Sequence, residues 1–348
     1  MKIITILGAR PQFIKAGIVS KIIEENNQFE ELIIHTGQHF DKNMSQIFFD
    51  QLEIAKPKYN LNINQMGHAQ MTGLMLIEIE KILLKEKPQG VIVYGDTNST
   101  LAGSLAASKL NIPIFHIEAG LRSFNMAMPE EINRILTDKI STLLFCPTEN
   151  AVNLLNKEGI KEGVVFTGDV MYDLFLSTPK NKIEEKNPFI LFTLHRHSNI
   201  ENPNVLKSIF SDLDKINSEI KVVFPIHPGT EKKLKQFKIK TNILTIPSLG
   251  YQEMVKYLIN SELVITDSGG LQKEAFFAEK KCITLRSETE WVELINSGTN
   301  ILCDTSKKSI LEVYNKIKLK KCDFSSQLYG DGKAAIKIVE HISNFLIS

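Results

Sequence analysis

The chain has 348 residues, of which 43% are hydrophobic and 23% charged, and its formal net charge at pH 7 is +1. Such a composition suits a globular protein with sizeable cores, and the length suggests two domains. The balanced charge gives no reason to expect nucleic acid or an anionic membrane as a partner, and no stretch is long and apolar enough to span a bilayer. The N-terminal apolar run is too short for a signal peptide. We therefore expect a cytoplasmic protein with reduced cysteines at 146, 282, 303 and 322.

Short β-branched runs alternate with helical patterns along the whole chain. In the first half we expect strands at 3–8, 32–37, 91–96, 113–119, 143–148 and 164–169, and a helix over 71–87 with Leu74, Ile77, Ile79, Ile82 and Leu83 on its apolar face. A second series of strands is expected at 189–195, 222–227, 243–247, 263–269 and 282–287. These runs are continuously apolar, which is typical of parallel strands buried on both faces. The polar segment 176–188 between the two series is expected to belong to the interdomain connection.

The first loop, G-A-R-P-Q-F-I-K at 8–15, follows the first expected strand. It has one glycine where a dinucleotide-binding loop has three, and it lacks the lysine and hydroxyl pair of an ATP-binding loop. Instead it carries two cations, Arg10 and Lys15. Because ligands of open α/β sheets bind at the carboxyl ends of the strands, we expect the site at this edge, in a cleft between two tandem α/β domains.

Three carboxylates are expected to converge near that edge. Asp96 and Glu118 follow the third and fourth strands, and Pro129 suits the first turn of a helix, which puts Glu130 near its N-terminus and Arg134 one turn on. Carboxylates that lie close together shift each other's pKa values and can carry protons. Alternatively, Asp96 is a helix cap and Glu130 a partner of the helix dipole. The three together favour a function.

In the second half, the sequences H-R-H, P-I-H-P and T-D-S-G-G end three successive strands. The last one opens a helix, whose N-terminal N–H groups can bind phosphate, and Glu274 lies one turn inside it, placed to accept from ribose hydroxyls. His195 and His227 end their strands at the same edge, although either could be a buried core histidine. No metal-ligand spacing such as H-E-x-x-H is present, so no metal is expected. A diphosphate-containing ligand such as a nucleotide sugar fits these residues.

Seven motifs, in order along nearly the whole chain, carry a family resemblance: GARPQFIK, TGQHFDKNM, VYGDTNSTLAG, HIEAGLRS, MPEEINR, TDSGGLQKEA and YGDGKA. They resemble the non-hydrolysing UDP-N-acetylglucosamine 2-epimerase family. The resemblance implies an α/β fold of two Rossmann-like domains of the glycosyltransferase-B type, with the active site in the interdomain cleft. The implied domains are 1–170, joined by a C-terminal helix at 333–347, and a UDP-binding domain at 171–332. It also implies a homodimer.

The implied reaction inverts C2 of the sugar without NAD or any other cofactor. UDP is eliminated across C1–C2 to leave a glycal, which is protonated on the other face before UDP adds again. The resemblance implies that the catalytic residues are Asp96, Glu118, Glu130 and His195, and that those binding the UDP-sugar substrate are Arg10, Lys15, Arg134, His227, Met254, Ser268, Gly269, Gly270, Glu274 and Glu290. Gln38 and His39 match a segment that binds a second nucleotide sugar as an activator in some members, or they form a loop that merely shapes the cleft.

The chain departs from the plain UDP-N-acetylglucosamine branch in three places. Its first loop has Pro-Gln-Phe for Pro-Glu-Ala, the segment 123–128 is short and apolar, and Trp291 stands where the branch has a substrate-contacting arginine. These variants resemble relatives that epimerise UDP-2,3-diacetamido-2,3-dideoxy-glucuronate for surface polysaccharide. Trp291 is either a core or a pocket residue. The alternatives are a UDP-N-acetylglucosamine 2-epimerase, a hydrolysing epimerase, a glycosyltransferase of the same fold and a nucleotide-sugar sensor.

Overall fold

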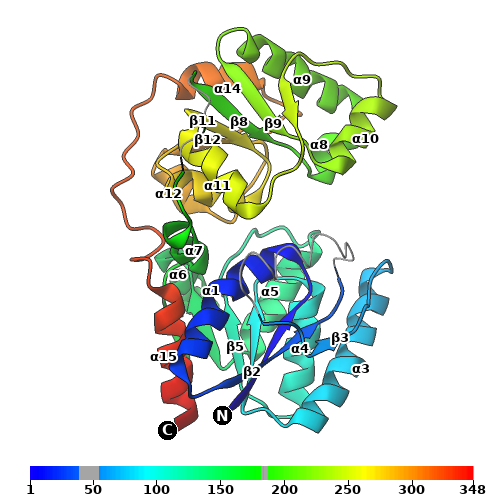
Figure 1. Ribbon diagram of the computed structural model, residues 1–348, viewed down its shortest axis with the longest axis vertical. Helices are drawn as coiled ribbons and strands as arrows, with labels where there is room; N and C mark the ends of the chain where they lie inside the picture. The colour runs from blue at the N-terminus through cyan, green and yellow to red at the C-terminus, as the bar shows by residue number, and fades with distance from the viewer. Residues whose placement is uncertain (39–54, 182, 184–186, 348) are drawn as a thin grey trace. The chain divides into compact units, whose positions relative to one another are not determined.

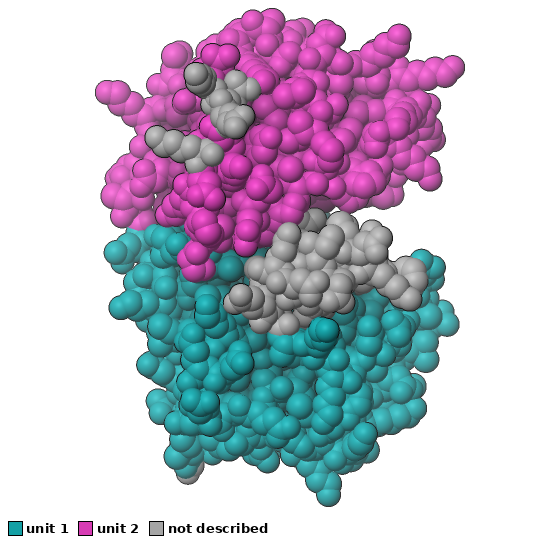
Figure 2. Space-filling model, viewed as in Figure 1, with its two compact units in different colours: residues 1–176, 327–348 teal, residues 177–326 magenta. Residues whose placement is uncertain are grey.

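The computed structural model describes residues 1–38, 55–181, 183 and 187–347 of the protein. The chain divides into two compact units, which Figure 2 shows in different colours. The first unit comprises residues 1–176 and 327–348, and the second comprises residues 177–326. Each contains a parallel sheet with helices, so the predicted fold class of two Rossmann-like α/β domains is confirmed (Figure 1).

The sheet of the first unit has seven parallel strands in the order β3-β2-β1-β4-β5-β6-β7. Every strand predicted in this half is present, and β3 was missed because it has only two residues. The strands are β1 (Lys2–Leu7), β2 (Glu30–His35), β3 (Tyr59–Asn60), β4 (Gly90–Tyr94), β5 (Ile114–Ile117), β6 (Leu143–Cys146) and β7 (Val164–Phe166).

Helices cover this sheet, and one of them arrives from the far end of the chain. Helix α15 (Ala334–Ile347) belongs to the first unit, where Phe345 packs edge-on against Phe115 of β5 with ring centroids 5.8 Å apart. It also contacts α1 (Figure 1). The other helices of the unit are α1 (Arg10–Asn26), α3 (His68–Glu86), α4 (Asn98–Lys109), α5 (Pro129–Ile140), α6 (Glu149–Lys157) and α7 (Val170–Ser177), the last ending at the boundary.

The predicted apolar face of helix α3 was partly wrong. Ile79, Ile82 and Leu83 are buried as expected, but Leu74 and Ile77 are 37% and 47% exposed, while Met75 is fully buried in their place. Residues four apart lie on the same side of a helix, so the buried stripe runs from position 75 to 79 and 83 and leaves 74 and 77 to either side.

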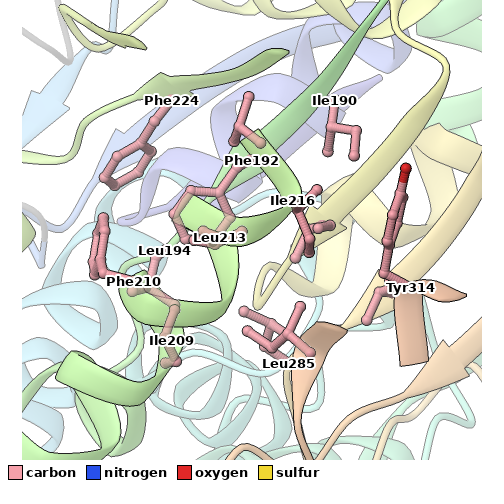
Figure 3. Close-up of a cluster of buried hydrophobic side chains, with 14 of the residues drawn as sticks. Ile190, Phe192, Leu194, Ile209, Phe210, Leu213, Ile216, Phe224, Leu285 and Tyr314 are labelled. Carbon is pink, nitrogen blue, oxygen red and sulfur yellow. The ribbon is translucent and has the colours of Figure 1, made fainter. Parts of the chain in front are cut away.

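The second unit has a six-stranded parallel sheet in the order β10-β9-β8-β11-β12-β13. Its five predicted strands are present, and the three-residue β13 was missed. The strands are β8 (Phe189–Thr193), β9 (Lys221–Pro225), β10 (Leu244–Ile246), β11 (Leu263–Thr266), β12 (Lys281–Thr284) and β13 (Asn300–Leu302). Figure 3 shows a core cluster of this unit, in which Phe192 packs edge-on against Phe210 and at a tilt against Phe224.

The helices of the second unit alternate with these strands, because parallel strands need crossover connections. They are α8 (His197–Ile200), α9 (Pro203–Asn217), α10 (Pro228–Gln236), α11 (Tyr251–Asn260), α12 (Gly269–Phe277), α13 (Val292–Asn296) and α14 (Ile310–Ile317). Within the described part of the chain, no helix is long and apolar enough to cross a membrane. In both units the strands run parallel, so the polar segments that follow them gather at one edge of each sheet.

Candidate active site

The first loop is fastened to the end of strand β4 by the side chain of Gln12. This residue is 1% exposed, its Oε1 accepts from the Gly8 and Ala9 N–H groups at 2.8 and 3.0 Å, and its Nε2 donates to Tyr94 O at 2.9 Å. Gln12, which was interpreted as a clue to the sugar, therefore orders the protein's own loop. Arg10 begins α1, but its side chain lies outside what the structure describes.

The single glycine of this loop is needed for close packing. A Cβ atom at Gly8 would lie 2.0 Å from Ser99 Oγ and 2.2 Å from Thr36 Oγ1. The end of β1 therefore contacts the first turn of α4 directly. Gln38 joins the same contact, because its Oε1 accepts from Ser99 N at 3.2 Å and from Ser99 Oγ at 2.8 Å. His39, the other predicted regulatory residue, lies outside the described residues.

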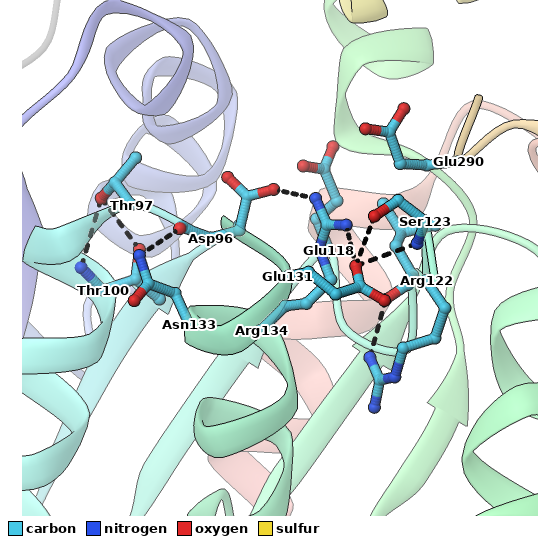
Figure 4. A network of polar contacts seen from close by, with 12 residues as sticks. Asp96, Thr97, Thr100, Glu118, Arg122, Ser123, Glu131, Asn133, Arg134 and Glu290 are labelled. Atoms are coloured by element: carbon cyan, nitrogen blue, oxygen red, sulfur yellow. Dashed lines mark hydrogen bonds and ion pairs between the residues drawn. The ribbon is translucent and has the colours of Figure 1, made fainter. Parts of the chain in front are cut away.

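Asp96 lies just beyond β4, where its carboxylate accepts a hydrogen bond from Arg134 (Figure 4). Burial raises the pKa of this carboxyl group above its ordinary value of 3.8, and Arg134 limits the rise while Glu118 adds to it. The helix α4 is capped by Thr97, whose hydroxyl accepts from Thr100 N at 3.3 Å. The alternative of Asp96 as the cap is therefore wrong, and its carboxyl group has the environment of a proton carrier.

Glu118 forms an ion pair with Lys15 beside the same turn. Both side chains are nearly buried, at 11% and 10% exposure respectively. A Cβ atom at Gly95 would lie 3.3 Å from Glu118 Oε1 and 3.6 Å from Lys15 Nζ, which places the pair next to the residue preceding Asp96. Of the three carboxylates expected to converge, Asp96 and Glu118 lie together here, each paired with a cation, Arg134 and Lys15 respectively.

The two adjacent glutamates of helix α5 have different environments. Glu130 is half-buried, and its carboxylate has no hydrogen-bond or ion-pair partner among the described residues. Glu131 is 1% exposed and accepts from Ser123 N, Ser123 Oγ and Phe124 N at 2.8–2.9 Å, and from Arg134 Nη1 at 2.5 Å. No role of Glu131 was predicted from the sequence, although its spacing of three from Arg134 is a signal for this pair.

In the second unit, Asp267 organises the segment that follows β8. This buried carboxylate accepts from the backbone N–H groups of His195 and Arg196 at 3.1 and 2.8 Å and from Asn199 Nδ2 at 3.1 Å, and it contacts His195 Nδ1 at 3.1 Å. Burial by itself raises the pKa of Asp267, but the contacts with His195, Arg196 and Asn199 outweigh it and hold the pKa below 3.8. Because Nδ1 faces Asp267, the other ring nitrogen of His195 is left for a ligand.

The alternative of two buried core histidines is wrong for both His195 and His227. The side chain of His195 is 44% exposed, and His227 is exposed as well, with the two ring centroids 6.1 Å apart. His227 Nδ1 accepts from Gly229 N at 3.1 Å and so caps helix α10. This leaves Nε2 of His227 as the hydrogen-bearing nitrogen.

Two arginine side chains lie near the N-terminus of helix α12. Ser268 is its cap and accepts from Leu271 N at 3.3 Å, and Gly269 and Gly270 form the first turn, as predicted. A Cβ atom at Gly269 would lie 3.9 Å from Arg286 Nη1 and 4.0 Å from Arg196 Nη2. Helix N-terminal N–H groups beside two guanidinium groups can bind an anion such as a diphosphate.

Neither arginine was identified from the sequence, although each follows a strand, in H-R-H and in C-I-T-L-R. Glu290 accepts from both terminal nitrogens of Arg286, at 2.9 and 3.1 Å, and so fixes its guanidinium plane. Of the other predicted substrate contacts, Glu274 is 7% exposed on α12 and Met254 is half-buried on α11.

Trp291 is a core residue. It is 4% exposed, immediately precedes α13, and the Nζ of the buried Lys273 lies 3.9 Å from the centre of its ring. This is a cation–π contact within the second unit. Among the described residues, no group of three or more histidine, cysteine, aspartate or glutamate side chains is arranged to hold a metal ion.

The chain is similar to known epimerases over its whole length. A family model described as UDP-N-acetylglucosamine 2-epimerase matches residues 21–343. A Pseudomonas aeruginosa protein named UDP-2,3-diacetamido-2,3-dideoxy-D-glucuronate 2-epimerase is 52% identical and covers 99% of both chains. A Methanococcus maripaludis protein named UDP-N-acetylglucosamine 2-epimerase homolog is 50% identical, covering 99% of this chain and 100% of its own. The crystal structure of Methanocaldococcus jannaschii UDP-GlcNAc 2-epimerase in complex with UDP-GlcNAc and UDP has a TM-score of 0.90 at 43% identity, covering 99% of this chain and 100% of its own.

Proposed function

This chain belongs to the UDP-N-acetylglucosamine 2-epimerase family, and from that premise we propose that it inverts C2 of UDP-2,3-diacetamido-2,3-dideoxy-glucuronate from the gluco to the manno form. The observation that carries this choice of sugar is the 52% identity, along 99% of both chains, with the Pseudomonas aeruginosa protein of that name. The three departures from the plain UDP-N-acetylglucosamine branch support the same choice as sequence signatures, although Gln12 and Trp291 make contacts within the protein itself.

We assign the nucleotide to the second unit. The N–H groups of Gly269 and Gly270 and the hydroxyl of Ser268, with the guanidinium groups of Arg196 and Arg286, supply the donors and positive charge that a departing diphosphate needs. His195, oriented by Asp267, adds a donor to the same segment. Glu274 is assigned to the ribose. Further substrate contacts proposed for this unit are His227, Met254 and Glu290, the last acting through Arg286.

We assign the sugar to the first unit. The C2 proton is not acidic, so the elimination needs a positioned base together with a stabilised leaving group. Asp96, Glu118 and Glu130 are the proposed proton carriers, and the raised pKa of Asp96 brings this carboxyl group closer to neutral pH, where an exchangeable proton is useful. Lys15 and Arg134 hold two of these carboxylates, and Arg10 is assigned to the substrate.

In the proposed sequence of steps, a carboxylate removes the C2 proton as the C1–O bond to UDP breaks, and the electron pair of the C2–H bond forms the C1–C2 double bond of the glycal. A carboxylic acid then returns a proton to C2 on the opposite face. UDP adds again at C1, so no oxidation occurs and no atom is lost.

The experiment that tests this function follows C2 by NMR in D2O. Incubated with UDP-2,3-diacetamido-2,3-dideoxy-glucuronate, the protein is expected to yield the manno epimer with deuterium at C2 and UDP still attached. Faster exchange with UDP-N-acetylglucosamine would assign the chain to the other branch, release of free sugar would indicate a hydrolysing enzyme, and no exchange with either sugar would refute an epimerase.

We propose a homodimer, to be checked by sedimentation velocity, and a cytoplasmic enzyme, on the ground that all four cysteines are free.

A second nucleotide sugar bound by Gln38 and His39 would activate the enzyme. A sigmoidal dependence of rate on substrate that becomes hyperbolic in Gln38→Ala would support this regulation.

A further inference from the structure

A fully buried histidine lies behind the proposed proton carriers. His116 belongs to strand β5 and is 0% exposed. Its Nε2 is 2.8 Å from the carbonyl oxygen of Gly95, and its Nδ1 is 2.7 Å from Asp138 Oδ1. A carbonyl oxygen only accepts hydrogen bonds, so Nε2 carries a hydrogen.

The second ring nitrogen also carries a hydrogen, because Asp138 is held as an anion. Asp138 accepts from Arg122 Nη1 at 2.6 Å and from Gly120 N at 3.2 Å, in addition to its contact with His116. A carboxylate paired with a guanidinium group keeps its negative charge, so the proton between it and the ring resides on Nδ1. His116 is therefore an imidazolium.

The charges around the ring balance. Two cations, His116 and Arg122, face two anions, Asp138 and Glu158, and Arg122 donates to Glu158 at 2.7 and 2.8 Å. Burial also raises the pKa of the nearby Cys146 thiol, which therefore stays neutral. A buried imidazolium is tolerated when it is paired and hydrogen-bonded in this way.

This network fixes the two turns that carry Asp96 and Glu118. Gly95, with φ +60°, donates its N–H to Ile117 O at 2.9 Å and accepts from His116, so both of its backbone polar groups are bound to β5. Glu118 has φ +67°, a left-handed conformation that is unfavourable for a residue with a side chain. Asp138 holds the segment after it through Gly120 and Arg122, so one carboxylate stabilises both turns.

We propose that His116 is a positioning residue, an imidazolium that, through Gly95 and Asp138, sets the separation and orientation of the Asp96 and Glu118 carboxylates for proton transfer at C2. The role of His116 in proton transfer rests on the proposed function. The protonation of its two ring nitrogens does not depend on that function. His116 itself touches no reacting atom.

Two substitutions of His116 each keep one of the two hydrogen bonds that its ring makes. His116→Asn keeps a donor where Nδ1 was, toward Asp138, and loses the hydrogen bond to Gly95. His116→Gln reaches as far as Nε2 and keeps the hydrogen bond to Gly95. We expect His116→Asn to lower kcat about 100-fold with KM changed less than about threefold, since a misplacement of about 1 Å has that effect, and His116→Gln to lower kcat less than about tenfold. Unchanged UDP affinity would show that the variants are folded.

The ring itself is tested in the wild-type protein by NMR of 15N-labelled histidine at neutral pH. Both nitrogens of His116 should give protonated shifts, with His116→Gln identifying the signals by their loss. One unprotonated nitrogen, or His116→Asn with the kcat of the wild type, overturns the inference while the proposed function stands. A wild-type protein that exchanges C2 of no UDP-sugar overturns the proposed function, and the positioning role with it.

Discussion

Arg134 donates one hydrogen bond to Asp96 and another, of 2.5 Å, to Glu131, so a single guanidinium group joins a proposed proton carrier to a buried structural carboxylate. Burial is the largest influence on the pKa of Asp96 and raises it, and Arg134 is the largest influence in the opposite direction. The same guanidinium group therefore lowers the pKa of Asp96 and fixes the position of its carboxylate.

The first prediction concerns Arg134→Met. Without the cation the pKa of Asp96 rises further, so Asp96 keeps its proton to higher pH. The limb of the pH–rate profile that belongs to Asp96 should then move to higher pH, and kcat should fall about 100-fold through lost positioning. Arg134→Lys, which retains a cation, should move the limb less. A profile identical to that of the wild type would contradict the ion pair.

The adjacent glutamates of α5 provide a matched pair of variants. Glu130→Gln should leave the free energy of unfolding within about 0.5 kcal/mol of the wild type, since its carboxylate is unpaired among the described residues, but slow C2 deuterium exchange about 100-fold. Glu131→Gln should cost about 3 kcal/mol, because Arg134 then loses a buried partner. Urea denaturation measures the free energy of unfolding, and NMR measures the rate of C2 deuterium exchange. If Glu130→Gln lost stability and Glu131→Gln lost only exchange, Glu131 would be the proton carrier and Glu130 the structural residue.

Glu131 also predicts a dependence of stability on pH. Burial raises its pKa, but hydrogen bonds from Ser123 and Phe124 and the charge of Arg134 outweigh this and lower the pKa from its ordinary 4.5. The resulting stabilisation is present above pH 4.5 and is lost as the pH falls through the lower folded-state value. Asp96 has a raised pKa, so its effect on the pH dependence of stability has the opposite sign. The quantity to measure is therefore the difference in free energy of unfolding between the wild type and Glu131→Gln. That difference should shrink in acid.

The anion site of the second unit is tested by Asp267→Asn. Loss of the charge that holds His195 and the Arg196 backbone should weaken UDP binding about tenfold, which is about 1.4 kcal/mol, by calorimetry. The control is Asp212→Asn, which alters another buried carboxylate of the same unit, one that accepts from Ser309 Oγ at 2.6 Å. Equal losses in both variants would mean that Asp267 acts on stability alone.

Trp291→Arg would restore the side chain found in the plain branch, yet we expect no gain of UDP-N-acetylglucosamine turnover. The new guanidinium group would lie against the buried ammonium of Lys273 in place of an aromatic ring, at a cost of about 2 kcal/mol or more in the free energy of unfolding. Trp291→Phe keeps a ring and should cost less. Since Trp291 is the single tryptophan of the chain, its fluorescence should be that of a buried indole.

Much of the fold could be predicted because buried parallel strands leave continuous apolar runs. Strands β4 and β8 consist of buried residues only, so each leaves an apolar run that predicts a strand. Strands β3 and β13 are too short to leave such a pattern. The polar residues at strand ends were predicted on the same principle, since Asp96 and Glu118 follow neighbouring strands.

The partners of these residues could not be predicted, because hydrogen bonds between distant segments leave no spacing in the sequence. Nothing near Gln12 shows that its amide bridges the first loop to Tyr94, and nothing near Asp267 shows that it organises the segment after β8. Trp291 stayed undecided for a related reason: a tryptophan beside a lysine on another helix is recognised only when both are placed.

The return of α15 to the first unit determines the order in which the protein can be completed during synthesis. Residues 177–326 are contiguous, so the second unit has all of its own chain before α15 has been made. The first unit begins earlier but leaves the ribosome without α15, whose Ile338, Val339 and Ile342 are buried in the complete unit and whose Phe345 packs against Phe115. Its apolar surface therefore stays open to water, and to chaperones, until residues 334–347 emerge.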